Sequence, residues 1–347
     1  MTNLIFVLSL FFICALTSLC VNEKKNTNNK IKWYIILSII IIIGVALRDG
    51  NSLNDYKNYV DIYNNSSRAG DVEPSFYIIK QISEPLGGMM AMFAIYAFLC
   101  VFIKIVAFYR LTKLLFLTLT VYVANIMILH DMTQIRAGVT SAVFLYSIPF
   151  LRDGKHIKYL ICVIIATFFH FSGLLLIIPC LYWIKCIRNS FLFLALIIPI
   201  GYLLGGTIFD VSNFPIESIR IKLQMYKNLQ AAGAAGLKDL NLFNPYIIFR
   251  IALYYILLSK SRLIAAHNEN FKCLLFIESI ALFVFPAFSS IALLGYRGSE
   301  LIGIVEVVLY PMLFYAIKPR LAGKLSVIGI GALLLGVNLT YKHLIYI

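Results

Sequence analysis

The feature that most constrains this chain is a succession of apolar segments separated by short basic stretches and two longer polar ones. Segments such as Leu4–Val21, Leu86–Ala107 and Ser190–Ile208 are long enough to cross a bilayer as a helix. Inside lipid every backbone polar group must be hydrogen-bonded within the protein, and a helix does this within one segment. The sequence therefore predicts an all-α polytopic membrane protein. We expect one transmembrane domain over residues 1–347, with about 12 (10–12) spanning segments.

The charge and composition exclude several functional classes. The net charge is +14, from 30 Lys and Arg against 16 Asp and Glu, but the bases flank apolar segments, as topogenic charges do. We therefore expect no nucleic-acid partner. The seven cysteines lie mostly in or beside apolar segments without metal-like pairs, and the five histidines are scattered. This pattern predicts neither a metal nor another cofactor. The first ten residues carry no Lys or Arg, which favours a first transmembrane helix over a cleaved signal.

The basic stretches define the expected topology. They are Glu23–Lys32, Arg110–Lys113, Arg152–Lys158, Lys185–Arg188, Lys260–Lys272 and Lys318–Lys324. The positive-inside rule places all of them in the cytoplasm, so an even number of crossings must separate each neighbouring pair. The 26 residues of Tyr159–Ile184 must then cross twice. We predict two short helices that meet near His170, in a water-filled depression below the outer surface.

With this topology both termini lie outside, and the outer side receives residues 48–85 and 209–245. The second of these segments contains an amphipathic stretch, 219–229, followed by the small residues 231–236. A mobile lid and a plain surface linker both remain open for it. The cytoplasmic loops are too short for a nucleotide-binding domain, which disfavours chemistry with ATP or a nucleotide sugar.

Five short motifs on the outer side resemble one known family. They are Asp-xxx-Tyr at Asp55–Tyr59, Glu73-Pro74, the helix opening Ile135–Val139, Phe-His-x-Ser at Phe169–Ser172, and a late arginine, Arg297. Their order and side resemble the EpsG-like branch of the Wzy polysaccharide polymerases, over residues 44 to 315. Ala137 departs from that family, which often has glutamine after the arginine, and no aromatic residue follows Arg297 closely.

This resemblance implies a metal-independent glycosyltransferase, a polysaccharide polymerase, at the outer face of the bacterial inner membrane. It would transfer a growing chain, such as O-antigen, from undecaprenyl diphosphate to a sugar hydroxyl of the next lipid-linked repeat unit. Its partners would be that lipid-linked oligosaccharide and membrane lipid, and a chain-length regulator and a flippase are candidate protein partners.

The candidate site residues follow from this chemistry. We expect Arg136 and Arg297 to bind the diphosphate, because guanidinium groups match phosphate oxygens bidentately. Arg136 also lies at a predicted helix start, where free amides favour anions. The candidate catalytic residues are His170, Asp55 and Glu73, with His170 preferred as the base. The expected sugar-binding residues are Tyr56, Tyr59, Asp131, Gln134 and Glu300.

Structural alternatives remain open for these residues. His170 could be a hydrogen-bonded core histidine, and Glu73 or Asp55 could instead cap the helix that follows it. Arg48 and Arg250 are interpreted as interfacial anchors. Glu278 and Glu306 lie inside expected helices, where a partner such as Lys104 or Arg250, or a role in proton coupling, would account for them.

Three other functions compete with polymerisation. A ligase that moves finished polysaccharide from the carrier to another lipid would use the same chemistry. A flippase or transporter of the lipid-linked unit would use Glu278 and Glu306 as coupling carboxylates, although the two halves show no repeat symmetry. A membrane O-acyltransferase is the third alternative.

Overall fold

The computed structural model describes residues 2–22, 28–65, 72–205, 217–231 and 240–345. Every regular element in these ranges is helical, so the all-α prediction is confirmed. The chain forms two compact units. Unit 1 comprises Met1–Ile177, Arg262–Phe271 and Glu306–Ile347, and unit 2 comprises Ile178–Ser261 and Lys272–Val305.

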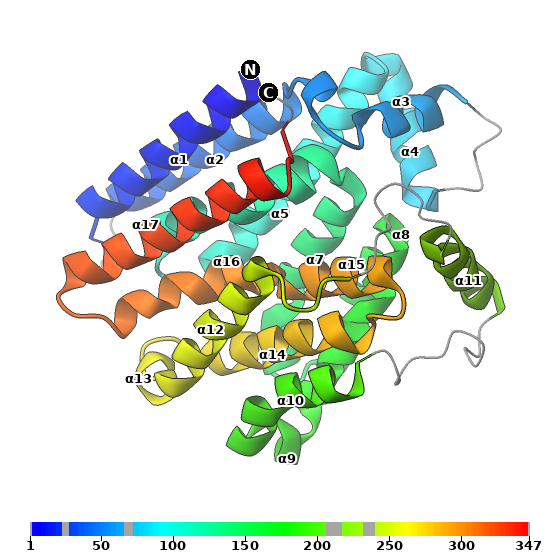
Figure 1. The fold of residues 1–347 in the computed structure, drawn as a ribbon. Coiled ribbons are helices and arrows are strands. Elements are labelled where there is room, and N and C mark those ends of the chain that lie inside the picture. The colour runs from blue at the N-terminus through cyan, green and yellow to red at the C-terminus, as the bar shows by residue number, and fades with distance from the viewer. Residues whose placement is uncertain (1, 23–27, 66–71, 206–216, 232–239, 346–347) are drawn as a thin grey trace. The chain divides into compact units, whose positions relative to one another are not determined.

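Unit 1 is a helical bundle (Figure 1). Its helices are α1 (Thr2–Cys20), α2 (Asn28–Ala46), α3 (Tyr56–Asn64), α4 (Pro74–Ser83), α5 (Met89–Leu111), α6 (Leu115–Tyr122), α7 (Ile135–Arg152), α8 (His156–Phe169), α16 (Glu306–Leu309) and α17 (Arg320–Gly336). A π-helix, Val123–Thr133, continues α6, and every residue of the combined element is buried. Most residues of this element are apolar, which suits the centre of a bundle.

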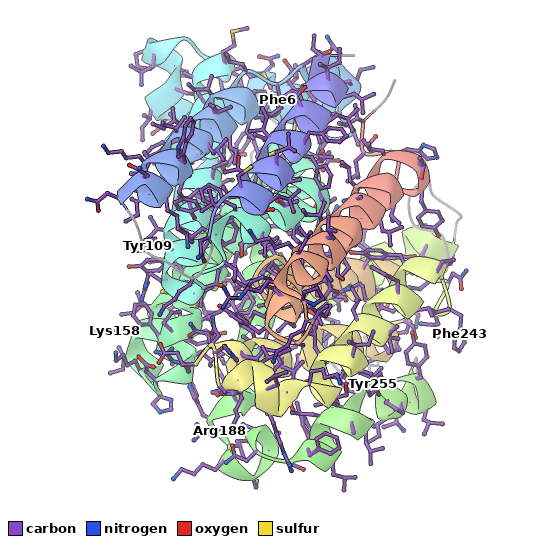
Figure 2. All side chains as sticks on the ribbon, turned by 90° about the vertical axis from the view of Figure 1, so that its left-hand side faces the viewer. Phe6, Tyr109, Lys158, Arg188, Phe243 and Tyr255 are labelled. Atoms are coloured by element: carbon purple, nitrogen blue, oxygen red, sulfur yellow. The ribbon has the colours of Figure 1, made fainter. Side chains whose placement is uncertain are left out.

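The outer helices of unit 1 present apolar side chains to their surroundings. Figure 2 shows α1 between α2 and α17. Phe6 of α1 packs on Gly44 of α2, where a Cβ atom would lie 2.0 Å from the ring. The opposite faces expose large apolar residues such as Phe12, Ile39 and Leu333. Exposed apolar surface on this scale fits contact with lipid rather than with water.

The number of membrane crossings stays a prediction. Within the described ranges, six helices are long and apolar enough to span a bilayer: Thr2–Cys20, Asn28–Ala46, Met89–Leu111, Leu115–Thr133, Ala292–Tyr315 and Arg320–Tyr341. Four shorter apolar helices accompany them: His156–Phe169, Phe171–Trp183, Phe191–Leu204 and Pro245–Ser259. The chain is therefore a polytopic membrane protein by the length and composition of its helices.

The predicted break at His170 is confirmed. Helix α8 ends at Phe169, His170 is extended (φ −153°, ψ 132°), and a 3₁₀-helix, Phe171–Trp183, follows. The two short helices turn back on each other, since the Tyr159 hydroxyl donates to the Leu176 carbonyl at 2.7 Å. At the turn, a Cβ atom on Gly173 would lie 2.6 Å from the Thr167 nitrogen, so only glycine permits this close approach.

Hydrogen bonds join the basic stretches of unit 1 at one end of the bundle. Lys30 donates to the Lys113 carbonyl at 2.6 Å, and Asn268 donates to that of Leu111 at 2.9 Å. Arg152 bonds Asn270 at 2.7 Å. The ammonium of Lys324 donates to three carbonyls at the end of α1. These contacts bring together four of the six stretches that the charge rule assigns to one side, and they place a fifth, Lys318–Lys324, beside the end of α1.

Unit 2 contains α9 (Lys185–Arg188), α10 (Phe191–Leu204), α11 (Glu217–Ala231), α12 (Pro245–Ser259), α14 (Phe271–Ala287) and α15 (Ala292–Ile302). Arg250 is 2% exposed, and donates to Glu278 at 3.2 Å and to Ser299 at 3.1 Å. Arg250 is thus an internal ion-pair partner of Glu278, as one sequence alternative held, and not an interfacial anchor. The amphipathic stretch 219–229 lies within α11, whereas residues 232–236 lie outside the described part of the chain.

Candidate functional site

Glu73 joins three segments that are far apart in the sequence. It lies at the N-cap position of α4, but its carboxylate makes no capping hydrogen bond. Its Oε2 pairs with Nη1 of Arg136. Its Oε1 lies 2.7 Å from Nδ1 of His170 and accepts the Phe171 amide hydrogen at 2.8 Å. The structure therefore brings together three predicted site residues, and excludes the capping alternative for Glu73.

Local structure explains why these three side chains meet. Pro74 is the first residue of α4, so Glu73 lies just before the helix. Arg136 is the second residue of α7, and His170 lies in the break after α8. The side chains of Glu73, Arg136 and His170 are 14, 15 and 18% exposed, respectively. The cluster is thus shielded but still reached by solvent, as a site for an external substrate requires.

The contact with Glu73 orients the imidazole of His170. A carboxylate can only accept a hydrogen bond, so Nδ1 of His170 carries the proton at 2.7 Å. In the neutral ring Nε2 is then the basic nitrogen. This is the relation between a base and the group that orients it in nucleophilic enzymes.

The carboxylate of Glu73 stays ionised over the whole physiological range. Burial alone would raise its pKa. The hydrogen bond from His170 and the charge of Arg136 outweigh burial and lower the pKa of Glu73 to about 2. Glu73 is therefore an acceptor and a fixed negative charge, not a proton donor.

Arg136 lies between Glu73 and an aromatic side chain. Its guanidinium carbon is 5.6 Å from the centre of the Tyr59 ring, a cation–π distance. Its Nε is buried and has no hydrogen-bond partner among the described residues. Gln134 precedes α7 without a side-chain cap, so the first-turn amides that favour anions are also present here.

The predicted sugar-binding tyrosines belong to an aromatic cluster. Tyr59 is 4% exposed and stacks on Phe76 with ring centres 6.3 Å apart. Tyr56 is half-buried and stacks on Phe93 at 5.3 Å. Tyr56 therefore has an accessible edge, whereas Tyr59 is an interior residue that supports Arg136. Asp55 precedes α3 without capping it, and its catalytic role stays a prediction.

Arg48 is a residue of this region that sequence reasoning assigned differently. Its guanidinium carbon lies 4.3 Å from the centre of the Phe93 ring, and Nη1 donates to the Val45 carbonyl at 2.8 Å. Burial lowers the pKa of Arg48 to about 10, so it stays protonated at neutral pH. An interfacial anchor keeps its charged end in water. The buried nitrogens of Arg48 do not fit that interpretation.

Asp131 lies in the interior of unit 1. Its side chain is fully buried, pairs with the ammonium of Lys104 and accepts a hydrogen bond from the Tyr122 hydroxyl. Lys104 also donates to the Gly138 carbonyl at 3.1 Å. This network connects α5, the π-helix and the start of α7, so Asp131 does not enter the proposed site. Gln134 is half-buried beside Arg136 in the chain, and its sugar-binding role stays a prediction.

Two predicted site residues belong to unit 2. Arg297 and Glu300 both lie on α15 and are half-buried. Their roles in binding diphosphate and sugar stay predictions. Among the residues that the structure describes, no group of three His, Cys, Asp or Glu side chains is placed to hold a metal ion.

Comparison with known proteins identifies the family of this chain. The EpsG family model matches residues 31–345. The chain belongs to the EpsG family. This family consists of Wzy-like polymerases, so the protein is a polysaccharide polymerase-like membrane protein. The region matched to the EpsG family contains Arg48, Glu73, Arg136, His170 and Arg297. No curated protein and no solved structure gives a significant match.

Proposed function

We propose that the protein polymerises lipid-linked oligosaccharide repeat units at the outer face of the bacterial inner membrane. The donor is a growing chain on undecaprenyl diphosphate, and the acceptor is a sugar hydroxyl of the next lipid-linked unit. The observation that carries this proposal is the cluster of Glu73, Arg136 and His170. It combines an oriented base with a cation at the place where three family motifs meet.

In the proposed reaction the acceptor oxygen attacks the anomeric carbon of the donor sugar. The bond between that carbon and the diphosphate oxygen breaks, and undecaprenyl diphosphate leaves with the bonding electrons. Nε2 of His170 takes the proton of the acceptor hydroxyl, while Nδ1–H stays hydrogen-bonded to Glu73. No nucleotide is needed, because the donor already carries its leaving group.

The charge balance of the cluster suits this reaction. Before reaction, the negative charge of Glu73 offsets the positive charge of Arg136. When His170 takes the proton, the cluster gains one positive charge as the leaving diphosphate gains one negative charge. Stabilising charge where it develops is an important source of catalysis.

The transporter alternative is less well supported by the buried charges. Glu278 pairs with Arg250, and Glu306 accepts a hydrogen bond from Asn125 at 2.9 Å. Both carboxylates thus have structural partners.

The basic stretch Arg152–Lys158 joins the C-terminal end of α7 to the start of α8, whereas Arg136 lies at the start of α7 and His170 follows the end of α8. The site therefore lies at the opposite ends of these two helices from that basic stretch, which agrees with the outer assignment.

The test is a gel of surface glycolipid from a deletion strain that carries wild type, Arg136→Ala or His170→Ala. We expect wild type to restore the ladder of chain lengths, and both variants to leave a single repeat unit. Loss of a general base typically lowers the rate about 10²–10⁴-fold. His156→Ala is the matched control, since His156 is exposed at the other end of α8.

Other outcomes identify the competing functions. Loss of even the single repeat in the deletion strain, with lipid-linked units on the inner leaflet, would indicate a flippase. Long undecaprenyl-linked chains that never reach their final lipid would indicate a ligase. A full ladder from His170→Ala at normal membrane level would show that the base is a different residue.

A further inference from the structure

The guanidinium of Arg48 has one edge without a protein partner. Its Nη1 donates to the Val45 carbonyl, whereas Nε and Nη2 are buried and make no hydrogen bond to any residue that the structure describes. Nε and Nη2 form the edge from which an arginine donates two parallel hydrogen bonds to a phosphate or carboxylate. The phosphate-matching edge of Arg48 is therefore the unoccupied one.

Stacking on Phe93 does not satisfy this edge. The ring centre lies 4.3 Å from the guanidinium carbon, so the aromatic face offsets part of the positive charge. The N–H groups, however, need hydrogen-bond acceptors, and an aromatic face is a poor substitute for them. A buried donor without an acceptor costs folding free energy, so its retention calls for a ligand.

The nearby carboxylates are already engaged. Asp131 is the acidic residue that acts electrostatically on Arg48, but it pairs with Lys104. Asp49 accepts the Asn51 amide hydrogen at 3.1 Å within its own turn. Glu73 pairs with Arg136. Among the residues that the structure describes, Arg48 thus forms no ion pair with a carboxylate.

Arg48 and Arg136 flank the same aromatic cluster. The guanidinium of Arg48 stacks on the Phe93 ring, and this ring packs edge-to-face on Tyr59 with ring centres 6.4 Å apart. The guanidinium of Arg136 in turn lies over the Tyr59 ring. The half-buried ring of Tyr56 stacks on Phe93. It also lies against Gly50, where a Cβ atom would lie 2.1 Å from the Tyr56 ring. Arg48 and Arg136 are therefore connected through the two buried rings of Phe93 and Tyr59, and Tyr56 is the half-buried ring of this cluster.

We propose that Arg48 is the second diphosphate-binding residue of the site and makes it prefer a lipid diphosphate to a lipid monophosphate. This inference rests on the proposed function. Arg136, whose positive charge is offset by Glu73, contacts one phosphate group of the lipid diphosphate. The unpartnered Nε–Nη2 edge of Arg48 donates hydrogen bonds to the other phosphate group. A monophosphate can occupy only one of the two positions.

The experiment measures binding of undecaprenyl diphosphate and undecaprenyl monophosphate to the full chain in lipid nanodiscs. We expect wild type to bind the diphosphate more tightly. In Arg48→Gln the Kd for the diphosphate should rise at least about tenfold, the effect of losing charge-assisted hydrogen bonds, while the Kd for the monophosphate changes less than about twofold. Arg48→Lys keeps the positive charge but cannot donate two parallel hydrogen bonds, so it should lose most of the preference for the diphosphate.

Arg110→Gln is the matched control. Arg110 also stacks on an aromatic ring, that of Tyr146 at 4.4 Å, and donates to a backbone carbonyl, but from the C-terminal end of α5. It should leave both Kd values unchanged. If Arg48→Gln does not fold, Arg48→Lys decides the question, because it retains the charge that lies over Phe93.

Each outcome separates this inference from the proposed function. Wild type that binds neither lipid would contradict the proposed function itself. Wild type that prefers the diphosphate, with both Arg48 variants unchanged, would overturn the role of Arg48 and leave the function intact. Equal losses for diphosphate and monophosphate would show that Arg48 acts only through the structure at the end of α2.

Discussion

Glu73 determines the geometry of the proposed site, because a single carboxylate contacts both Arg136 and His170. Glu73→Gln keeps the size of the side chain but removes the charge that fixes the imidazole. We expect polymerisation by purified protein to fall about 10²-fold or more, since the imidazole loses its orientation and the stabilisation of its protonated form. The loss should appear mainly in kcat, measured with lipid-linked repeat units in proteoliposomes. A raised KM with unchanged kcat would instead assign Glu73 to substrate binding.

The lowered pKa of Glu73 also predicts how stability depends on pH. The ordinary value is 4.5 and the folded value is about 2. The ionised carboxylate therefore stabilises the folded state above pH 4.5, and this contribution is lost as the pH falls from 4.5 towards 2. We expect wild type to melt at a higher temperature than Glu73→Gln at pH 6, with the difference shrinking below pH 4.5. A constant difference across this range would contradict the ion pairing of Glu73.

The sequence predicts all three residues of the cluster but not their arrangement. His170, Glu73 and Arg136 are predictable as site residues because each is ionisable and lies on the expected outer side. Nothing in their spacing shows that one carboxylate joins the other two. Arg48 was missed because a cation just after an apolar segment is usually an anchor at the membrane surface. Only the fold reveals that part of its guanidinium is buried.

At the scale of elements, the close turn between α8 and the following 3₁₀-helix holds His170 in position. A Cβ atom at Gly173 would lie 2.6 Å from the Thr167 nitrogen and 2.8 Å from the Ala166 carbonyl carbon, both rigid backbone atoms. We expect Gly173→Ala to cost about 1–3 kcal/mol of unfolding free energy, the usual range for overpacking, and to reduce activity by displacing His170.

Gly329→Ala is the control for this substitution. Nothing lies within 4 Å of a Cβ atom at Gly329 in α17, so alanine there should leave activity unchanged and raise the melting temperature slightly. Thermal unfolding in detergent and ladder formation in cells measure the two effects. If Gly173→Ala were as stable as wild type, the turn would be less tightly packed than the structure indicates.

The buried pair of Lys104 and Asp131 joins α5 to the π-helix, and Lys104 also contacts Gly138 in the first turn of α7. Removing one partner leaves a buried charge, so Lys104→Met should destabilise the protein by about 3–5 kcal/mol. Replacing both, as Lys104→Met with Asp131→Leu, should recover most of that loss. A double variant as unstable as the single one would assign the cost to lost packing rather than to the unpaired charge.

The elements themselves were predictable to different degrees. The break at His170 followed from counting basic stretches, because two crossings must fit into Tyr159–Ile184. The π-helix Val123–Thr133 did not follow from the sequence. Its apolar residues have no period that distinguishes it from an α-helix. Asp131, a predicted sugar-binding residue, lies in this element and is fully buried beside Lys104.

At the scale of the whole molecule, the positive-inside rule makes one prediction that both units must satisfy. Every basic stretch, including Lys185–Arg188 of unit 2, should face the cytoplasm. Within unit 1 the contacts made by Lys30, Asn268 and Lys324 already bring such stretches to one end of the bundle. The stretch in unit 2 tests the rule independently, because its side depends on the two short crossings around His170.

Two native cysteines provide this test without altering the site. Cys20 and Cys186 are both exposed, one at the end of α1 and the other in α9. A membrane-impermeant maleimide should label neither in intact cells, and should label both once the inner membrane is permeabilised. Asn58→Cys, exposed on α3 in the predicted outer segment, should be labelled in intact cells and serves as the positive control. Labelling of Cys186 from outside would mean that Tyr159–Ile184 crosses only once, which would place unit 2 in the opposite orientation and remove the argument for a site at the outer face.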